Sequence, residues 1–212
     1  MILDPRNLLS TAGIYSLFRR IVGGSRPGNR YMSDFVRVKP GQRILDIGCG
    51  PADLLADIPY DVDYHGFDTE PKYIEAAKLR YRDRGTFRVQ AVAPEAVEGI
   101  GDFDLAVATG VVHHLDDQEA DMLFAGAAKI LRPGARLVTL DGVYVERQNP
   151  IAKILLKLDR GRHVRTADQY IALAQKHFEI VKSTILHDLM TIPYTHIILE
   201  AERPKIARRD QA

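Results

Sequence analysis

Short apolar runs alternate with helical periodicities along most of the chain. Five runs have the length and composition of buried strands: 43–47, 63–67, 87–91, 105–108 and 136–140. Apolar residues at helical spacing separate several of these runs, most clearly at 70–84 and 117–131. Because strands that alternate with helices form parallel sheets, the pattern predicts a mostly parallel, doubly wound α/β sheet.

Two helical patterns precede the first strand. Residues 7–22 carry an apolar stripe that starts at Ile14 and ends at a glycine pair, and a shorter segment places Tyr31, Phe35 and Val38 on one face. These helices either cover an edge of the sheet or form a cap over a cleft. An amphipathic stripe requires only an apolar surface beneath it, which favours simple covering.

The alternation changes after residue 145. Residues 150–158 place four apolar residues on one face beside two lysines, and a capping box opens another helix at Thr166. Two strands joined by a turn near Pro193 follow. We expect helix 150–158 to pack against the sheet rather than to rest on a membrane surface.

A chain of 212 residues can bury one sizeable core, so we expect one domain over residues 1–204. Its expected parts are N-terminal helices at 1–40, a core at 41–145, a helical insertion at 146–177 and a C-terminal strand pair at 178–204. Residues 205–212 have the composition of a disordered tail.

Composition narrows the classes of partner. The 29 Lys and Arg against 28 Asp and Glu give a net charge of +1, which predicts no general attraction for nucleic acid. No run approaches the about 18 apolar residues of a membrane span, and no signal-peptide pattern opens the sequence. The single cysteine excludes an internal disulfide. We therefore expect a cytoplasmic protein without membrane insertion or a nucleic-acid partner.

The stretch RILDIGCGPADLL at 43–55 contains the strongest site signal. A strand ends near Asp46, and Gly48 and Gly50 allow a sharp turn that a ligand can approach closely. A dinucleotide fingerprint would need a third glycine where this chain has Asp53, and no phosphate-loop motif is present. A dinucleotide-dependent oxidoreductase is therefore disfavoured. Asp68, at the end of the second strand, is placed either to accept hydrogen bonds from ribose hydroxyls or to cap a helix.

This stretch resembles the first motif of class I S-adenosylmethionine-dependent methyltransferases. FDLAVATGVVHHLDD at 103–117 is similar to the fourth-strand motif of the small-molecule and sugar methyltransferases, and LRPGARLVTLD at 131–141 is similar to their fifth-strand region. The three motifs occur in the order of the family.

The resemblance implies a Rossmann-like, doubly wound, seven-stranded mixed sheet with an antiparallel last strand, helices on both faces and an N-terminal helical cap. It implies S-adenosyl-L-methionine as cofactor and S-adenosyl-L-homocysteine as product. We expect transfer of the methyl group to a small-molecule acceptor, by O-methylation of a sugar or secondary metabolite. The alternatives are a methyltransferase acting on RNA or protein and a non-catalytic cofactor-binding partner subunit.

The resemblance also implies a set of cofactor contacts. These are Asp46, Gly48, Cys49, Gly50, Asp68, Thr69, Gln90, Ala91, Thr109, Gly110 and His113. The adenine contact departs from the family pattern, because Ala91 has no side-chain acceptor, and Gln90 or a backbone carbonyl would replace it. Cys49 shows no partner that would lower its pKa, so we interpret it as a small apolar filler.

The candidates for a general base or an orienting group are His113, His114, Asp141 and Tyr144. A structural role for the two histidines is the more frequent outcome, since methyl transfer needs chiefly alignment. The run DRGRHVR at 159–165 is either a solvated turn or an anion-binding clamp. The expected substrate contacts are Arg160, Arg162, His163, Arg165 and Tyr194. No cluster has metal-ligand spacing.

Overall fold

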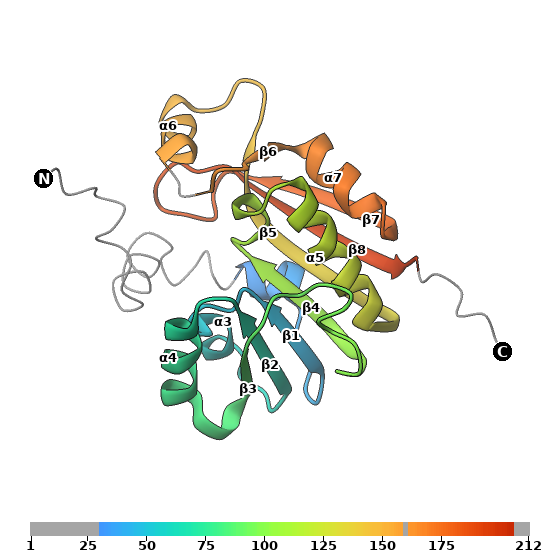
Figure 1. Cartoon of the computed structure of the whole chain (residues 1–212). Coiled ribbons are helices and arrows are strands. Elements are labelled where there is room, and N and C mark those ends of the chain that lie inside the picture. The colour runs from blue at the N-terminus through green and yellow to red at the C-terminus, as the bar shows by residue number, and fades with distance from the viewer. Residues whose placement is uncertain (1–29, 159–160, 206–212) are drawn as a thin grey trace, which may run out of the picture.

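The computed structural model describes residues 30–158 and 161–205 (Figure 1). The predicted helix at 7–22, Arg160 and the predicted tail from residue 206 onward lie outside the described residues.

A mixed sheet with the strand order β3-β2-β1-β4-β5-β8-β7 forms the centre of the molecule. The parallel strands are β1 (Arg43–Ile47), β2 (Asp63–Asp68), β3 (Thr86–Val89), β4 (Phe103–Thr109) and β5 (Leu131–Tyr144). Strand β8 (His196–Pro204) runs antiparallel to β5 and to β7 (Phe178–Leu186), and the two-residue β6 (Arg165–Thr166) pairs with the end of β5. The predicted α/β class with an antiparallel last strand is confirmed.

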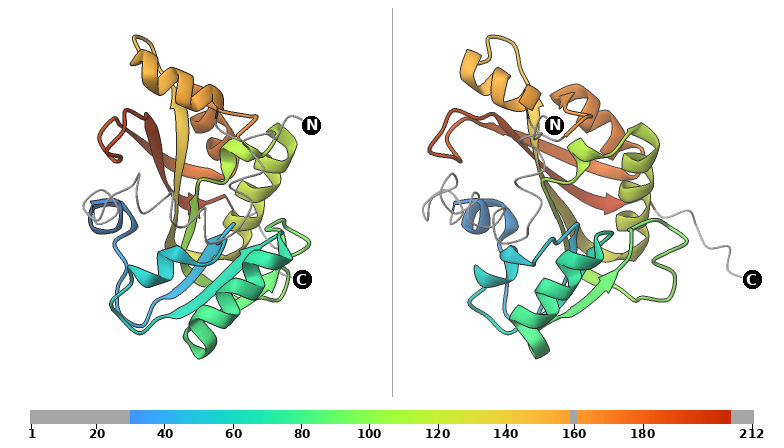
Figure 2. Two further views of the ribbon diagram at one scale, coloured as in Figure 1. Left: turned by 90° about the vertical axis from the view of Figure 1, so that its left-hand side faces the viewer. Right: turned by 60° about the vertical axis from the view of Figure 1, so that its left-hand side comes forward.

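Helices cover both faces of this sheet (Figures 1 and 2). On one face α5 (Asp117–Ile130) and α7 (Ala167–Gln175) pack on a core that includes Leu45 and Ile47. On the other face lie η2 (Tyr31–Val36), α3 (Asp53–Ala56) and α4 (Pro71–Tyr81), which share a core with Ile44. Successive side chains of a strand thus point into opposite cores. This explains why these strands appear in the sequence as continuous apolar runs.

The short elements shape the carboxyl edge of the parallel strands. The 3₁₀ turn η4 (Val112–His114) follows β4 at this edge, whereas η3 (Arg82–Arg84) follows α4 and leads into β3 at the opposite edge. Strand β5 extends four residues beyond the predicted 136–140 run and so carries Asp141 and Tyr144 at its carboxyl end. None of the helices within the described residues is long and apolar enough to cross a lipid bilayer.

The segment η2 makes contacts that fit both expectations for it. Tyr31 and Phe35 are buried, and the Arg136 guanidinium donates to the carbonyl oxygens of Phe35 and Val36, so η2 covers a face of the sheet. The Tyr31 hydroxyl also lies 3.2 Å from Thr109 Oγ1 at the end of β4. This segment therefore links the sheet face with its carboxyl edge.

Helix α6 (Pro150–Leu158) is present as predicted and packs against β5 through Leu156, but the apolar stripe seen in the sequence does not make this contact. Ile151, Ile154 and Leu158 are 55%, 57% and 68% exposed. The buried side chains are Ala152 and Leu156, which lie about 150° around the helix from that stripe. Leu156 packs on Gly142, whose lack of a side chain leaves room for it: a Cβ there would stand 2.6 Å from Leu156 Cδ2.

Candidate functional site

The glycine turn after β1 combines tight packing with open space. Gly48 and Gly50 have φ values of +65° and +54°, a region that favours glycine. A Cβ on Gly48 would lie 2.6 Å from Val111 Cγ2, whereas a Cβ on Gly50 would meet nothing within 4 Å. The Gly48 and Cys49 N–H groups donate to the carbonyl oxygen of Phe67 at 2.7 and 3.0 Å, which ties the turn to β2. Gly48 is thus required by packing, and Gly50 borders free space.

Asp68 at the end of β2 is joined to this turn. Its Oδ2 accepts from the Gly50 N–H at 2.8 Å, and its Oδ1 accepts from the Glu70 N–H at 2.8 Å. The N-cap of α4 is Glu70 and not Asp68. The Asp68 carboxylate is half-exposed and held at the turn by two backbone amides, beside the open side of Gly50.

Asp46 and Cys49 lie behind the turn. Asp46 is buried and accepts a hydrogen bond from the Tyr64 hydroxyl. Burial raises the pKa of the Cys49 thiol, and the charges of Asp46 and Asp68 raise it further. The thiol therefore stays protonated and unreactive, in keeping with its interpretation as a filler.

The expected adenine contacts lie next to Asp68. The Gln90 N–H donates to the Asp68 carbonyl oxygen at 2.9 Å, so the ends of β2 and β3 meet here. The Gln90 side chain donates to the Ala96 carbonyl oxygen and is thereby held by the following loop. Thr69 and Ala91 are exposed.

The end of β4 continues the same edge. Ala108 pairs with Ile47 across β4 and β1, which brings Thr109 and Gly110 beside the glycine turn. Gly110 has φ +71°, and its N–H donates to the Leu140 carbonyl oxygen at 2.7 Å. The half-exposed Thr109 and Gly110 therefore lie between β1 and β5.

His113 and Asp141 form the most buried polar pair at this edge. Asp141 is 1% exposed, and its Oδ1 accepts from both the backbone N–H of His113 at 3.1 Å and ring Nδ1 at 2.8 Å. Asp141 Oδ2 is buried and has no hydrogen-bond partner within the described part of the chain. Gly161 packs on the ring so closely that a Cβ would stand 2.0 Å from His113 Cδ2. The imidazole is thus fixed from two sides.

The other catalytic candidates differ in placement. The centre of the His114 ring lies 4.3 Å from the centre of the His113 ring, and His114 is exposed. Tyr144 is three positions beyond Asp141 on β5, and residues three apart on a strand point to opposite faces. The structure therefore brings together His113, His114 and Asp141, but not Tyr144.

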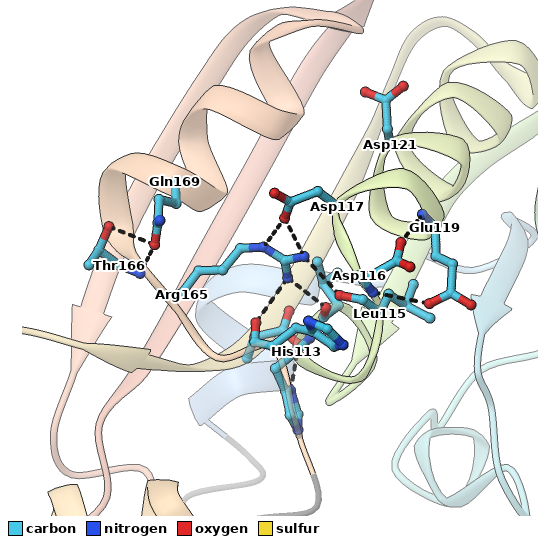
Figure 3. A network of polar contacts seen from close by, with 12 residues as sticks. His113, Leu115, Asp116, Asp117, Glu119, Asp121, Arg165, Thr166 and Gln169 are labelled. Carbon is cyan, nitrogen blue, oxygen red and sulfur yellow. Dashed lines mark hydrogen bonds and ion pairs between the residues drawn. The ribbon is translucent and has the colours of Figure 1, made fainter.

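Arg165 occupies a position unlike the expected anion clamp (Figure 3). Its side chain is buried, and its Nε and Nη2 donate to Asp117 Oδ1 at 2.9 and 2.8 Å. Its other bonds go to the carbonyl oxygens of Val112, Leu115 and His163. These five bonds use the full donor capacity of a guanidinium, so Arg165 holds the η4 region in place and is not open to an anion.

The remaining substrate candidates surround this network. Arg162 is exposed, and the backbone N–H of His163 donates to the His113 carbonyl oxygen at 3.0 Å. Tyr194 lies on the β7–β8 loop, and the centre of its ring is 4.7 Å from the centre of the His196 ring. A Cβ on Gly142 would stand 2.8 Å from the Tyr194 hydroxyl oxygen.

Sequence reasoning missed the contacts of Gly142 and Gly161. A glycine at the end of a buried strand or beside a run of charged residues was the only available signal. Within residues 30–158 and 161–205, no group of three His, Cys, Asp or Glu side chains could hold a metal ion.

Known proteins share the core of this chain. Residues 45–137 match a family described as a methyltransferase domain. An uncharacterized methyltransferase of Synechocystis sp. is 26% identical over 133 residues, which cover 60% of this chain and 62% of that protein. An O-methyltransferase of Pyrenophora dematioidea is 34% identical over 112 residues, which cover 50% of this chain and 41% of that protein. The chain thus spans less than two thirds of either relative.

A solved structure extends the likeness to the fold. It is a phosphoethanolamine N-methyltransferase of Haemonchus contortus, in complex with phosphomonomethylethanolamine and S-adenosylhomocysteine. It superposes with a TM-score of 0.70 at 18% identity and covers 94% of this chain and 59% of that one. The family match identifies residues 45–137 as a methyltransferase domain, and the strand order and the superposition show that the chain has a methyltransferase fold.

Proposed function

We propose that this chain transfers a methyl group from S-adenosylmethionine to a small-molecule acceptor. One observation carries the proposal. At one edge of the sheet, the Gly48–Gly50 turn and the Asp68 carboxylate lie beside Thr109 and Gly110, and the His113–Asp141 pair follows on the neighbouring strand ends. The edge therefore has two adjoining parts. The cofactor half contains Gly50 and Asp68, and the acceptor half contains His113 and Asp141.

The groups present fit the cofactor. The half-exposed Asp68 carboxylate suits ribose hydroxyls, and the free space before Gly50 admits a ligand that any Cβ-bearing turn would crowd. Thr109 and Gly110 would line its methionine part, and Gln90 lies beside Asp68 for the adenine. The bound cofactor would supply a methyl group made electrophilic by its positively charged sulfur.

The His113–Asp141 pair would serve the acceptor. A carboxylate that accepts from Nδ1 fixes the tautomer in which the other ring nitrogen carries a lone pair. That nitrogen would accept the proton of an acceptor hydroxyl as the oxygen attacks the methyl carbon. The segment 161–165, held by Arg165, packs against the ring and would help to keep water out.

We infer that the acceptor atom is a hydroxyl oxygen, on a sugar or a secondary metabolite. An imidazole suits deprotonation of a hydroxyl, and the name of the Pyrenophora relative is consistent with this choice. An anionic acceptor would meet Arg162 and His163 in place of Arg165. The near-zero net charge disfavours RNA.

Titration calorimetry with S-adenosylmethionine, S-adenosylhomocysteine and NAD tests the proposal. Both sulfur nucleosides should bind at micromolar concentration and NAD should not. Asp68→Ala should abolish binding, whereas Asp61→Ala, an exposed carboxylate on the loop before β2, should leave it unchanged. If neither sulfur nucleoside binds the unaltered chain, the proposal is wrong.

Transfer of a labelled methyl group to phenolic, catecholic and sugar hydroxyls then tests catalysis. A chain that binds the cofactor but labels none of these acceptors would be the non-catalytic partner subunit instead. Loss of labelling in His113→Ala, with cofactor affinity retained, would assign the imidazole to the acceptor half.

A further inference from the structure

Helix α6 presents an apolar stripe that nothing in the described structure covers. Ile151, Ile154 and Leu158 are each more than half exposed, and they lie on one side of a nine-residue helix. Elsewhere, large exposed apolar residues such as Leu79 on α4 and Met122 on α5 stand on separate helices. Scattered exposed apolar residues are ordinary, whereas a contiguous stripe indicates an interaction surface.

The surroundings of the stripe are basic. Lys153 and Lys157 are exposed along one flank of α6, and Arg147 and Arg162 are exposed in the adjoining loops. Residues 146–162 contain five Lys or Arg against two acidic residues, whereas the whole chain has a net charge of only +1. Positive charge is therefore concentrated around the apolar stripe.

This charge argues against two occupants from the chain itself. Residues 1–29 also carry an amphipathic pattern, but they contain four arginines against one aspartate, so docking them on α6 would bring like charges together. A second copy that paired α6 with α6 would oppose lysines to lysines. An apolar stripe flanked by cations is complementary to the surface of an anionic lipid bilayer.

The helix has the length and place for such contact. Nine residues span about 14 Å, too short to cross a bilayer but suited to lie in its interface. Figures 1 and 2 show α6 at one end of the molecule, at the carboxyl end of β5. Its inner face packs through Leu156 on Gly142, the residue after Asp141.

We propose that α6 docks the domain on anionic lipid surfaces and so presents the acceptor half of the site to an amphiphilic acceptor held in the membrane. The docking is independent of catalysis, and only the nature of the acceptor rests on the proposed function. The apolar stripe supplies the contact with the acyl boundary, and the lysines supply the preference for negative headgroups.

Co-sedimentation of the full chain with vesicles tests the docking. The chain should bind vesicles that contain phosphatidylglycerol several-fold better than pure phosphatidylcholine, and added salt should weaken the binding. The double variant Ile154→Gln/Leu158→Gln should lose at least about tenfold in affinity. The control Leu79→Gln/Met122→Gln, which alters two exposed apolar residues elsewhere, should bind normally. Lys153→Gln/Lys157→Gln should cost roughly fivefold per lysine, and only on anionic vesicles.

Other occupants give different results, and each would overturn the proposal. A concentration-dependent dimer that Ile154→Gln/Leu158→Gln dissociates would assign the stripe to a second copy. If the amides of α6 are protected from hydrogen exchange and the variant Leu17→Gln/Phe18→Gln loses this protection, residues 7–22 cover the stripe. Equal vesicle binding by the double variant and its control would show that the stripe has no part in docking.

Calorimetry with S-adenosylmethionine on the same preparations separates the two proposals. Cofactor binding without vesicle binding refutes the docking alone. Vesicle binding without cofactor binding refutes the proposed function and leaves the docking intact.

Discussion

The two halves of the sheet's carboxyl edge are built in different ways. The half at β1 and β2 is made of backbone amides and glycines, with Asp68 held by two N–H groups and free space before Gly50. The half at β4 and β5 is made of buried side chains: His113 is bonded to Asp141, and Arg165 makes five hydrogen bonds to Asp117 and three backbone carbonyl oxygens. The first offers backbone groups and free space to a ligand, whereas the second depends on contacts between side chains that are distant in the sequence.

The largest expected effect is in the side-chain half. Arg165→Ala would leave the carbonyl oxygens of Val112 and Leu115 buried without a donor and remove the partner of Asp117. The Asp117 carboxylate is largely exposed, so the cost comes from the two carbonyl oxygens, at about 1–3 kcal/mol each and about 2–6 kcal/mol together. Urea unfolding should therefore show a drop of that size for Arg165→Ala and almost none for the exposed neighbour Arg162→Ala. A similar small loss in both would mean that the network contributes nothing.

The next largest effect on the free energy of unfolding is in the half made of backbone groups. Two glycine substitutions there and nearby separate the cost of a positive φ from the cost of a steric clash. Gly48→Ala must adopt φ +65° and place a Cβ 2.6 Å from Val111, which together cost about 2–4 kcal/mol. Gly41→Ala has a similar φ of +74° but open space around its Cβ, so it should cost only about 1–2 kcal/mol. Unfolding and cofactor titrations measure both. Equal losses would show that the close approach to Val111 is unimportant.

The same contrast explains what the sequence could and could not predict. The β1 strand, its glycine turn and Asp68 lie within 26 residues and follow local rules, so their places were predictable. The His113–Asp141 bond joins residues 28 apart, and the Arg165–Asp117 pair joins residues 48 apart. These contacts depend on strand register and on a loop path that no local pattern encodes.

Arg165 and α6 show two ways in which prediction from the sequence failed. The run at 159–165 was open between a solvated turn and an anion clamp, and the sequence does not show that three carbonyl oxygens and Asp117 converge on Arg165. Periodicity predicted the stripe of α6 correctly but could not say which side of the helix would meet the sheet. The buried side packs through Leu156 on Gly142, which has no side chain to exclude it.

A smaller effect on stability should separate the halves by function. Asp141→Asn keeps the shape of the side chain but weakens the charged hydrogen bond to His113, at a cost of about 1–3 kcal/mol. We expect methyl transfer to fall at least about a hundredfold, with a changed pH profile, while S-adenosylmethionine affinity stays the same. Rate assays and calorimetry on one preparation measure both. An equal fall in affinity would mean that the halves are not separate.

The smallest effect concerns another buried imidazole, His65 on β2, which also has an aspartate partner. Burial lowers the pKa of His65 below its ordinary 6.5, although Asp63 opposes this shift. The unfolded chain therefore binds more protons near that pH, so this group makes stability fall as the pH drops below about 6.5. Between about pH 7.5 and pH 5.5 the loss should be less than about 1 kcal/mol, and His65→Gln should remove it. Urea unfolding at the two pH values measures the difference. A variant that keeps the full pH dependence would show that this dependence arises from another group.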